Sequence, residues 1–284
     1  MKSAAAPSPR LLDRVDLLLL RVAKRRRERF RGDRAFYDAF FGERDLDKYV
    51  RDIRNRWRFA LVDDALRRRF PVRKPDILDV GCGLGIAHRF LSVPRTYVGV
   101  DMSATTVELA RGLHPQATAD FHVGALPNLP LSSASIDAAI CLEVLEHVDD
   151  DRAALRELHR VLRPRGFLIV AVPQTFYWAA YQELIGHYRH YTAGSLRGLL
   201  RQEGFEVVES LPQLVRLWRT YHYAYVAALG IEALARRIFR QSVSLYDSRL
   251  YEGAARVLLQ VLDSRRRQSS EGSTFVVAQR LDQT

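Results

Sequence analysis

The chain has little cysteine and no long apolar run. Its 284 residues contain two cysteines, Cys82 and Cys141, both in predicted core segments, so a disulfide framework is excluded and a reducing compartment is indicated. The stretch 221–235 is nearly free of charge but shorter than the ~20 apolar residues that a spanning helix needs. In residues 11–31 the apolar part precedes the basic part, which is the reverse of a signal peptide. We therefore expect a cytoplasmic protein with neither a signal peptide nor a transmembrane span.

The net charge of +11 is concentrated at the two ends of the chain. Residues 1–70 hold 20 basic against 11 acidic residues and residues 211–284 hold 11 against 6, whereas residues 71–210 hold 13 against 16. Basic flanks favour an anionic partner, which is a phospholipid surface, an acidic or phosphorylated substrate, or nucleic acid.

Both flanks are predicted to be helical. Residues 1–70 read as an N-terminal basic helical cap, in which the amphipathic helix 11–31 either lies on an anionic membrane or ends in a solvated basic face. A second helical stretch, 46–69, carries Tyr49 and Trp57 at helical spacing. Residues 211–273 read as a helical insertion, which is a lid over the substrate, a membrane-surface element, or an ordinary hairpin that completes the core.

A glycine-rich turn is the centre of the chain. The apolar strand 76–80 leads into three glycines at every second position, Gly81, Gly83 and Gly85, and then into a helix. This order is typical of a nucleotide-binding α/β unit, but a dinucleotide fingerprint needs a third glycine one residue later. Asp79 before the turn would repel a pyrophosphate and suit a cation, and Asp101 at the end of the next strand suits a ribose diol. The predicted ligand is a positively charged nucleoside without phosphate.

Four blocks in order carry a family resemblance: ILDVGCGLG (77–85), VGVDMS (98–103), SSASIDAAICLEVLEHV (132–148) and LRELHRVLRPRGFLIVAVP (155–173). Together they resemble the class I methyltransferases of the UbiE/UbiG-like kind, which use S-adenosylmethionine (SAM) and release S-adenosylhomocysteine (SAH). The resemblance covers about residues 71–210 and a closing strand near 274–280. It implies a SAM-binding domain made of residues 71–210 and 274–284.

The expected fold is α/β, a doubly wound seven-stranded Rossmann-like sheet. The alternation of patterns predicts strands at 76–80, 96–100, 119–123, 136–142, 167–172, 205–210 and 274–279. Helices are predicted between them at 84–92, 103–113, 150–162 and 195–203. The resemblance implies that strands 1 to 6 are parallel and that strand 7 inserts antiparallel between strands 5 and 6.

The resemblance also implies which residues contact the cofactor. Asp79 and the backbone of the glycine turn would meet the methionine part, Asp101 the ribose, and Met102 the adenine. The family often has an Asp after strand 3, where this chain has Ala125, so backbone amides and apolar contacts would have to hold the adenine. The full set expected to contact the cofactor is Asp79, Gly81, Cys82, Gly83, Asp101, Met102, Gly124, Ala125, Leu126, Leu142 and Glu143.

Two clusters of titratable residues follow strands 4 and 5. In UbiG-like quinone methyltransferases and small-RNA 2′-O-methyltransferases, a Glu-x-x-Glu-His pattern with a further histidine is implicated in metal binding. Glu143, Glu146 and His147 match that pattern, and His187 or His190 could be the further histidine; we expect no divalent metal here and keep Glu143, Glu146 and His147 as the alternative metal set. His147 is otherwise a structural or substrate-facing residue, and it is the third histidine among the catalytic candidates, with His187 and His190.

The segment 186–192 holds two histidines, an arginine and two tyrosines beyond the carboxyl end of the sheet. A hydroxyl nucleophile needs a base, and histidine is the usual choice near neutral pH. We expect His187 or His190 to be that base and Arg189 to hold an anionic group. The predicted substrate contacts are Tyr49, Trp57, Tyr188, Arg189 and Tyr191.

The sequence therefore predicts methyl transfer from SAM to a hydroxyl, less readily an amine, of a small, anionic or lipid-linked acceptor. The basic flanks are compatible with peripheral membrane contact. One alternative is an RNA 2′-O-methyltransferase, although no RNA-binding module is evident and a nucleic-acid partner is not expected. Another is a scaffold with the same fold that binds a membrane or partner and does not catalyse.

Overall fold

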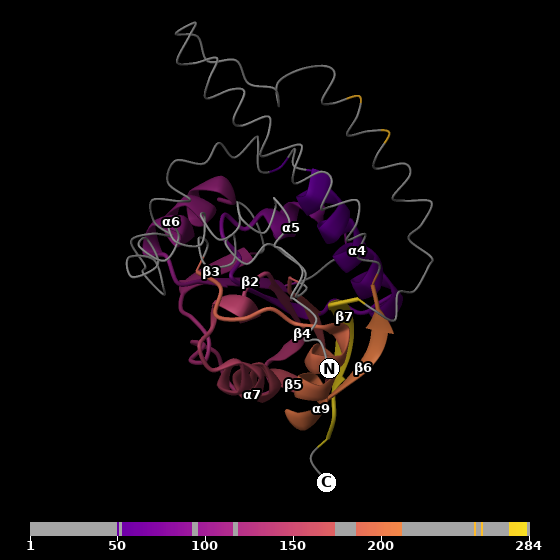
Figure 1. Cartoon of the computed structure of the whole chain (residues 1–284). Helices are drawn as coiled ribbons and strands as arrows, with labels where there is room; N and C mark the ends of the chain where they lie inside the picture. The colour runs from indigo at the N-terminus through magenta and orange to yellow at the C-terminus, as the bar shows by residue number, and fades with distance from the viewer. Residues whose placement is uncertain are drawn as a thin grey trace, which may run out of the picture.

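A seven-stranded sheet forms the centre of the chain (Figure 1). A computed structural model describes residues 50, 53–92, 96–115, 119–173, 186–211, 253, 257 and 273–282. The strand order is β3-β2-β1-β4-β5-β7-β6, with β7 antiparallel to both neighbours and the other pairs parallel. The predicted sheet, including the place and direction of strand 7, is confirmed. The bounds are β1 Asp76–Val80, β2 Thr96–Asp101, β3 Ala119–Val123, β4 Ile136–Leu142, β5 Leu162–Ala171, β6 Phe205–Ser210 and β7 Phe275–Arg280.

Helices cover both faces of the sheet (Figure 1). On one face lie α4 (Ile53–Arg69), α5 (Ile86–Phe90) and α6 (Ala104–Leu113); on the other lie α7 (Asp151–Val161) and α9 (Ala193–Gln202), and a short 3₁₀ turn, η1 (Leu145–His147), follows β4. Three of these helices begin at a side-chain cap, since Ser103, Asp150 and Thr192 each accept a hydrogen bond from a backbone N–H three residues on. None of the described helices is long and apolar enough to cross a membrane.

The central strands divide their side chains between two hydrophobic cores. Strand β4 reads Ile-Asp-Ala-Ala-Ile-Cys-Leu and is buried over its first six residues, as a strand covered on both faces must be. Because side chains alternate along a strand, neighbouring residues enter opposite cores. One core joins the sheet to α4 and α6, and includes Trp57, Leu61, Leu66, Ile77, Tyr97, Val107, Phe121 and Ile140.

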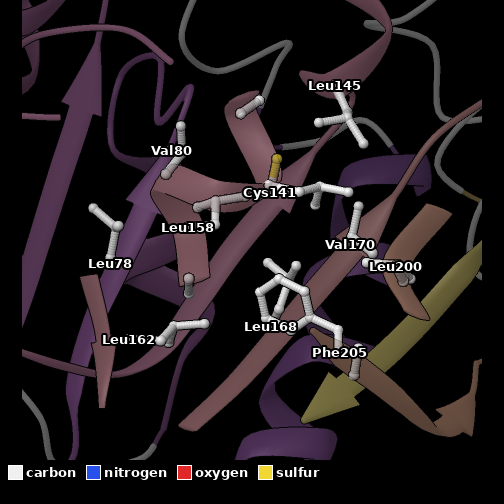
Figure 2. Packing of buried hydrophobic residues seen from close by; sticks show 14 of the residues in the cluster. Leu78, Val80, Cys141, Leu145, Leu158, Leu162, Leu168, Val170, Leu200 and Phe205 are labelled. Carbon is white, nitrogen blue, oxygen red and sulfur yellow. The ribbon is translucent and has the colours of Figure 1, made fainter. Parts of the chain in front are cut away.

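The opposite core joins the sheet to α7 and α9. Figure 2 shows Leu158 and Leu200 from the two helices, which meet Leu168 and Val170 from the centre of the sheet. Leu145 of η1 and Phe205 of β6 belong to the same cluster, so the turn after β4 is anchored in the core. This anchoring fixes the position of the residues that flank the turn.

Some element bounds differ from the prediction. The fifth strand was predicted to start at 167 but β5 begins at Leu162, directly after α7, because Ile136 of β4 pairs with Leu162 before the register shifts. Proline and glycine after a helix usually mark its end, and the sequence therefore suggested a turn at Pro164 and Gly166 before the strand. In the structure both residues lie inside β5. Helix α5 is shorter than the predicted 84–92, since the glycine turn extends to Gly85.

Several predictions lie outside the described residues. They concern the helix 11–31, Tyr49, and the insertion 211–273 apart from Leu211, Gly253, Val257 and Ser273. Helix α4, which the sequence assigned to the N-terminal cap, packs into the core of the sheet through Trp57, Leu61 and Leu66.

The core packing predicts the effect of a cavity. Leu168 is fully buried between β4, β7 and α7, so Leu168→Ala should lower the free energy of unfolding by about 2–5 kcal/mol, the usual cost of emptying such a site. Chemical denaturation checks this. Val208→Ala on exposed β6 is the matched control and should change stability by less than about 0.5 kcal/mol. Equal effects of the two variants would contradict the packing described above.

Candidate active site

The candidate site lies at the carboxyl edge of the parallel strands. Strand β1 pairs with β2 on one side and β4 on the other, so the chain order reverses beside β1. In open α/β sheets, ligands bind at such a switch point, beyond the carboxyl ends of the strands. The glycine turn after β1, Asp101 at the end of β2, and Glu143 after β4 all stand at this edge.

The glycine turn needs glycine for two physical reasons. Gly81, Gly83 and Gly85 all have positive φ, at 68°, 52° and 70°, which side chains disfavour. The turn is also crowded, because a Cβ on Gly81 would lie 2.4 Å from Cγ2 of Val144 and one on Gly85 would lie 2.6 Å from the Phe121 ring. The motif is thus a tightly packed bend.

Asp101 fixes the turn in place. Its Oδ2 accepts a hydrogen bond from the Gly83 N–H at 3.0 Å and its Oδ1 accepts one from the Ser103 N–H at 2.9 Å. The carbonyl of Val100 accepts hydrogen bonds from Gly81 and Cys82 at 2.8 and 3.2 Å. The end of β2 therefore holds the turn after β1 by three hydrogen bonds, one of which is to a carboxylate.

Asp79 is buried on the same side of the sheet as Ile77. Burial raises the pKa of its carboxyl from 3.8 to about 7; a hydrogen bond from the Tyr97 hydroxyl opposes this shift, and the charge of Asp101 adds to it. Asp79 forms no ion pair in the described part of the chain. Asp79 and Asp101 are both buried and their negative charges repel each other, so a positively charged ligand would stabilise them. These residues therefore fit the predicted cofactor, SAM.

The residues expected around the adenine follow β2 and β3. Met102 is half-buried beside Asp101, and the Gly124 N–H donates to the Asp101 carbonyl at 3.0 Å. Ala125 forms an isolated bridge with Asn128, whose N–H donates to the Ala125 carbonyl at 2.9 Å. Leu126 packs against the second core. This loop is thus held beside the end of β2 by its own backbone, with no acid at Ala125.

Leu142, at the end of β4, and Glu143 after it lie next to α4. Leu142 is half-buried, and Glu143 has φ of 57°, a left-handed conformation that is uncommon for a residue with a side chain. The Glu143 carboxylate faces the guanidinium of Arg58 on α4, with 3.6 Å between Oε1 and Nη2. Sequence reasoning missed Arg58, because its spacing on α4 resembles that of its neighbours and only the packing of α4 brings it to the site.

Three histidines and a glutamate meet next to this edge. His187 Nδ1 lies 2.6 Å from His190 Nε2, and the His147 and His187 rings stack edge to face at 4.4 Å. The structure thus brings together the three histidines that the sequence placed in two separate segments. On the other side of His187, Nε2 lies 4.0 Å from Oε1 of Glu146.

Glu146 is fully buried, and neither carboxylate oxygen accepts a hydrogen bond from the described residues. Burial, and secondarily the charge of Glu143, raises the Glu146 pKa well above its usual value. Burial lowers the pKa of His147 to about 4, with the nearby His190 adding to the shift, and also lowers that of His187. Both imidazoles are therefore neutral at neutral pH.

This cluster contains a donor set that fits a divalent cation. One donor atom each from Glu146, His147 and His187 lie within 4.8 Å of one another. Imidazole and carboxylate suit zinc and related metals, and an otherwise unbonded buried carboxylate would gain a partner. His187 takes the place of Glu143 in the metal set named from the sequence, since Glu143 faces Arg58.

The other side chains of segment 186–192 are largely bonded within the protein. Arg189 donates to the carbonyls of Val148 and Asp149 and forms an ion pair with Asp151 at 3.4 Å. Tyr191 is buried and its hydroxyl donates to Asp151 at 2.9 Å. These contacts hold the segment against the start of α7.

Tyr188 and Trp57, two further predicted substrate contacts, lie in different parts of the structure. The Tyr188 N–H donates to the Glu146 carbonyl at 2.8 Å, and its ring lies beside the Arg189 guanidinium, which ties the segment to the turn after β4. Trp57 is 4% exposed and packs in the core that joins α4 to the sheet.

The crowding at Gly81 gives a direct test of the turn. Gly81→Ala should lower the free energy of unfolding by about 2–4 kcal/mol, from the left-handed φ and the contact with Val144. Adding Val144→Ala should recover the steric part, whereas Gly112→Ala, where a Cβ meets nothing within 4 Å, should be neutral or stabilising. Thermal unfolding of the four proteins measures this. A Gly81→Ala protein as stable as the parent would contradict the geometry.

Comparison with known proteins identifies the family. The family model described as a methyltransferase domain matches residues 78–170. An S-adenosylmethionine-dependent methyltransferase of Mycolicibacterium smegmatis is 33% identical over 176 residues, which are 60% of this chain and 66% of that protein. An O-methyltransferase of Aspergillus nomiae is 34% identical over 151 residues, covering 49% of this chain and 67% of that protein. The matches span 60–66% of the length of the mycobacterial relatives.

A solved structure agrees with this assignment. It is a complex of the Haloferax volcanii Trm112 methyltransferase activator with a methyltransferase, and one of its chains is 26% identical to this chain, with a TM-score of 0.53. The match covers 61% of this chain and 77% of that one. The four sequence blocks of the resemblance coincide with residues 78–170, which the family model matches, to within three residues at either end. The sheet also has the strand order that the resemblance implies. The chain therefore belongs to the class I S-adenosylmethionine-dependent methyltransferases.

Proposed function

We propose that the protein transfers a methyl group from SAM to a hydroxyl group of a small acceptor and releases SAH. The observation that carries this proposal is the pair of hydrogen-bonded histidines, His187 and His190, next to the edge where Asp79, Asp101 and the glycine turn lie. A histidine pair supplies the base that a hydroxyl needs. Relatives named as O-methyltransferases support the same acceptor chemistry.

The acidic edge would hold the cofactor. Asp101 would accept hydrogen bonds from the ribose hydroxyls, and Asp79 with the Gly81 and Gly83 backbone would face the methionine ammonium. Met102 and the loop at Gly124, Ala125 and Leu126 would contact the adenine. When bound, SAM supplies a methyl carbon already activated by the sulfonium, so the protein chiefly has to align the acceptor, exclude water and remove a proton.

The protonation pattern of the histidine pair decides which nitrogen acts as base. If His190 Nε2–H donates to His187 Nδ1, then His187 carries its proton on Nε2, on the side of Glu146, and His190 Nδ1 is the ring nitrogen that takes the proton of the acceptor. His187 is buried while His190 is half-exposed, which favours His190 as the residue that meets the acceptor. His187 and Glu146 then act as positioning residues.

A divalent cation would require the opposite arrangement. Glu146, His147 and His187 would hold it, and it would place positive charge beside the acceptor oxygen. His187 would have to ligate through the Nε2 that faces Glu146, so its proton would move to Nδ1 and point at His190 Nε2. His190 would then carry its own proton on Nδ1 and would not be a base there. The base and the metal are therefore competing uses of one cluster, and we propose the base.

The acceptor is proposed to be anionic or linked to a lipid. The support is the excess of basic residues in 1–70 and 211–284, where charge would favour an acidic substrate or an anionic membrane surface met by a cytoplasmic enzyme. Arg189 contributes less to this than the sequence suggested, because its guanidinium already bonds Val148, Asp149 and Asp151.

Replacing the proposed base should abolish turnover without loss of the cofactor. With a panel of small phenols and hydroxy acids as acceptors, His190→Ala should lower the rate of SAH release by about 10²–10⁴-fold, the usual contribution of a general base. Calorimetry should give the parent affinity for SAM. His122→Ala on exposed β3 is the matched control and should behave like the parent, whereas Asp101→Ala should lose SAM binding. Parent-like turnover by His190→Ala would exclude it as the base, and a parent that binds no SAM would exclude the function.

The competition between base and metal predicts the response to cations. A chelator should leave SAH release unchanged, and Zn²⁺ should inhibit it toward the level of His190→Ala, because the ion captures His187. Co²⁺ absorption monitors occupancy independently of turnover. Glu146→Gln, which removes one donor, should weaken both the inhibition and the Co²⁺ signal. Activity that is lost to a chelator and restored by a divalent cation would overturn the choice of a metal-free base.

Binding to vesicles tests the membrane part of the proposal. The full chain should sediment with vesicles of mixed phosphatidylglycerol and phosphatidylcholine but not with phosphatidylcholine alone. Salt at about 0.5 M should release the protein, because the ions then screen the attraction between its basic residues and the anionic lipids. No binding to anionic vesicles would leave only a free small acceptor, and equal binding to both vesicle types would exclude charge as the cause.

A further inference from the structure

Tyr97 is buried directly against the acidic residue of the glycine turn. It lies on β2 with no exposed surface, and its hydroxyl donates a hydrogen bond to Oδ2 of Asp79 at 2.5 Å. In the parallel pair of β1 and β2, Tyr97 stands opposite Ile77, and Asp79 stands opposite Gly99. The two side chains are thus diagonal neighbours on one face of the sheet.

The ring of Tyr97 has little freedom to move. The His88 ring of α5 meets it edge to face at 5.0 Å, and the Phe121 ring of β3 lies at 6.0 Å. A Cβ on Gly99 would lie 2.6 Å from the Phe121 ring, so the missing side chain at Gly99 lets these rings fill the space beside Asp79. A phenylalanine would pack the same volume, which means that the hydroxyl adds a polar contact and no packing.

The groups around Asp79 give its charge little other support. Asp101 at the end of β2 repels it, and the Cys82 thiol of the turn and the Cys141 thiol of β4 are neutral, since burial and nearby carboxylates raise the pKa of both. Asp79 forms no ion pair with a described residue. Within this environment the Tyr97 hydroxyl is the described group that favours the ionised form.

We propose that Tyr97 is a positioning residue of the cofactor site, whose hydroxyl holds the Asp79 carboxylate in place and favours its ionised form, which would face the ammonium end of SAM. The inference rests on the proposed function, in which Asp79 faces that ammonium. No residue of the chemical step is involved. The hydrogen bond to a carboxylate acts before any methyl transfer, on the affinity for the cofactor.

The ionisation of Asp79 determines how the affinity for SAM should change with pH. Asp79 binds a cation when ionised, and its pKa without ligand is about 7, so affinity should rise as the pH increases through that value. Below it, binding should expel the proton of Asp79. Removing the Tyr97 hydrogen bond should weaken SAM binding about tenfold at neutral pH and move the midpoint upward by about one pH unit.

Calorimetry of SAM and SAH binding from pH 5.5 to 8.5 tests this on the full chain. The parent, Tyr97→Phe, Asp79→Asn and the double variant are titrated in two buffers of different ionisation heat, which counts the protons released. The ammonium of the ligand titrates identically in all four proteins, so the differences between them report on Asp79. We expect proton release by the parent near pH 6.5, a higher midpoint in Tyr97→Phe, and no effect of Tyr97→Phe in the Asp79→Asn background.

The outcomes separate the two levels of the proposal. A parent protein that does not bind SAM contradicts the proposed function itself. A parent that binds, with Tyr97→Phe lowering only the melting temperature while the midpoint and proton count stay unchanged, overturns the role of Tyr97 and leaves the function intact. If Tyr97→Phe does not fold, Tyr97→Leu, which also lacks the hydroxyl, replaces it in the same titrations, and an unchanged midpoint and proton count in that variant contradict the inference.

Discussion

The structure of the site depends on one carboxylate, that of Asp101. It accepts one hydrogen bond from the turn after β1 and one from the cap of α6, and so joins the loop, the neighbouring strand and the next helix at a single point. A carboxylate can accept several bonds at once, and backbone N–H groups at the start of a turn or helix need acceptors. The residue that the family resemblance assigns to the ribose is thus also the residue that shapes the cradle. In the proposed function, cofactor binding and local folding would depend on the same group.

The carboxyl edge of the sheet holds buried acidic residues that folding alone would not favour. Asp79 and Glu146 are buried acids with raised pKa values, and neither forms a hydrogen-bonded ion pair in the described part of the chain. Such groups cost stability, and acids with strongly shifted pKa values gather at functional sites. By contrast, the buried Asp137 at the opposite edge is fully engaged, with Arg73, Arg163 and the Asp76 N–H as partners. Among the described residues, the opposite edge thus pairs its buried acid with two arginines, and the carboxyl edge, where the proposed function places the cofactor, leaves Asp79 without such a pair.

The histidine cluster shows why a list of residue types does not decide a mechanism. Glu146, His147 and His187 would serve a metal, and His187 with His190 would serve a base, but the two uses need opposite protonation of the same ring. The choice depends on which nitrogen of His187 carries the proton. That is a property of the neighbours of His187, and those neighbours come from separate segments after β4 and β5.

Much of the fold could be predicted from the sequence, because tight turns that require glycine and the alternation of apolar residues in strands are both local patterns. The turn at Gly81–Gly85, the acid at Asp101, and all seven strands appear in the sequence, and strand 7 was placed by family resemblance. The early start of β5 was missed because the pairing of Leu162 with Ile136 overrides the turn signal of Pro164 and Gly166. Only the tertiary structure joined Tyr97 to Asp79, Arg58 to Glu143, and His187 to Glu146, because each pair lies on different elements. It also placed Trp57 in the core and bonded Arg189 to the protein, since burial and partner choice depend on what packs across space, which no local pattern encodes.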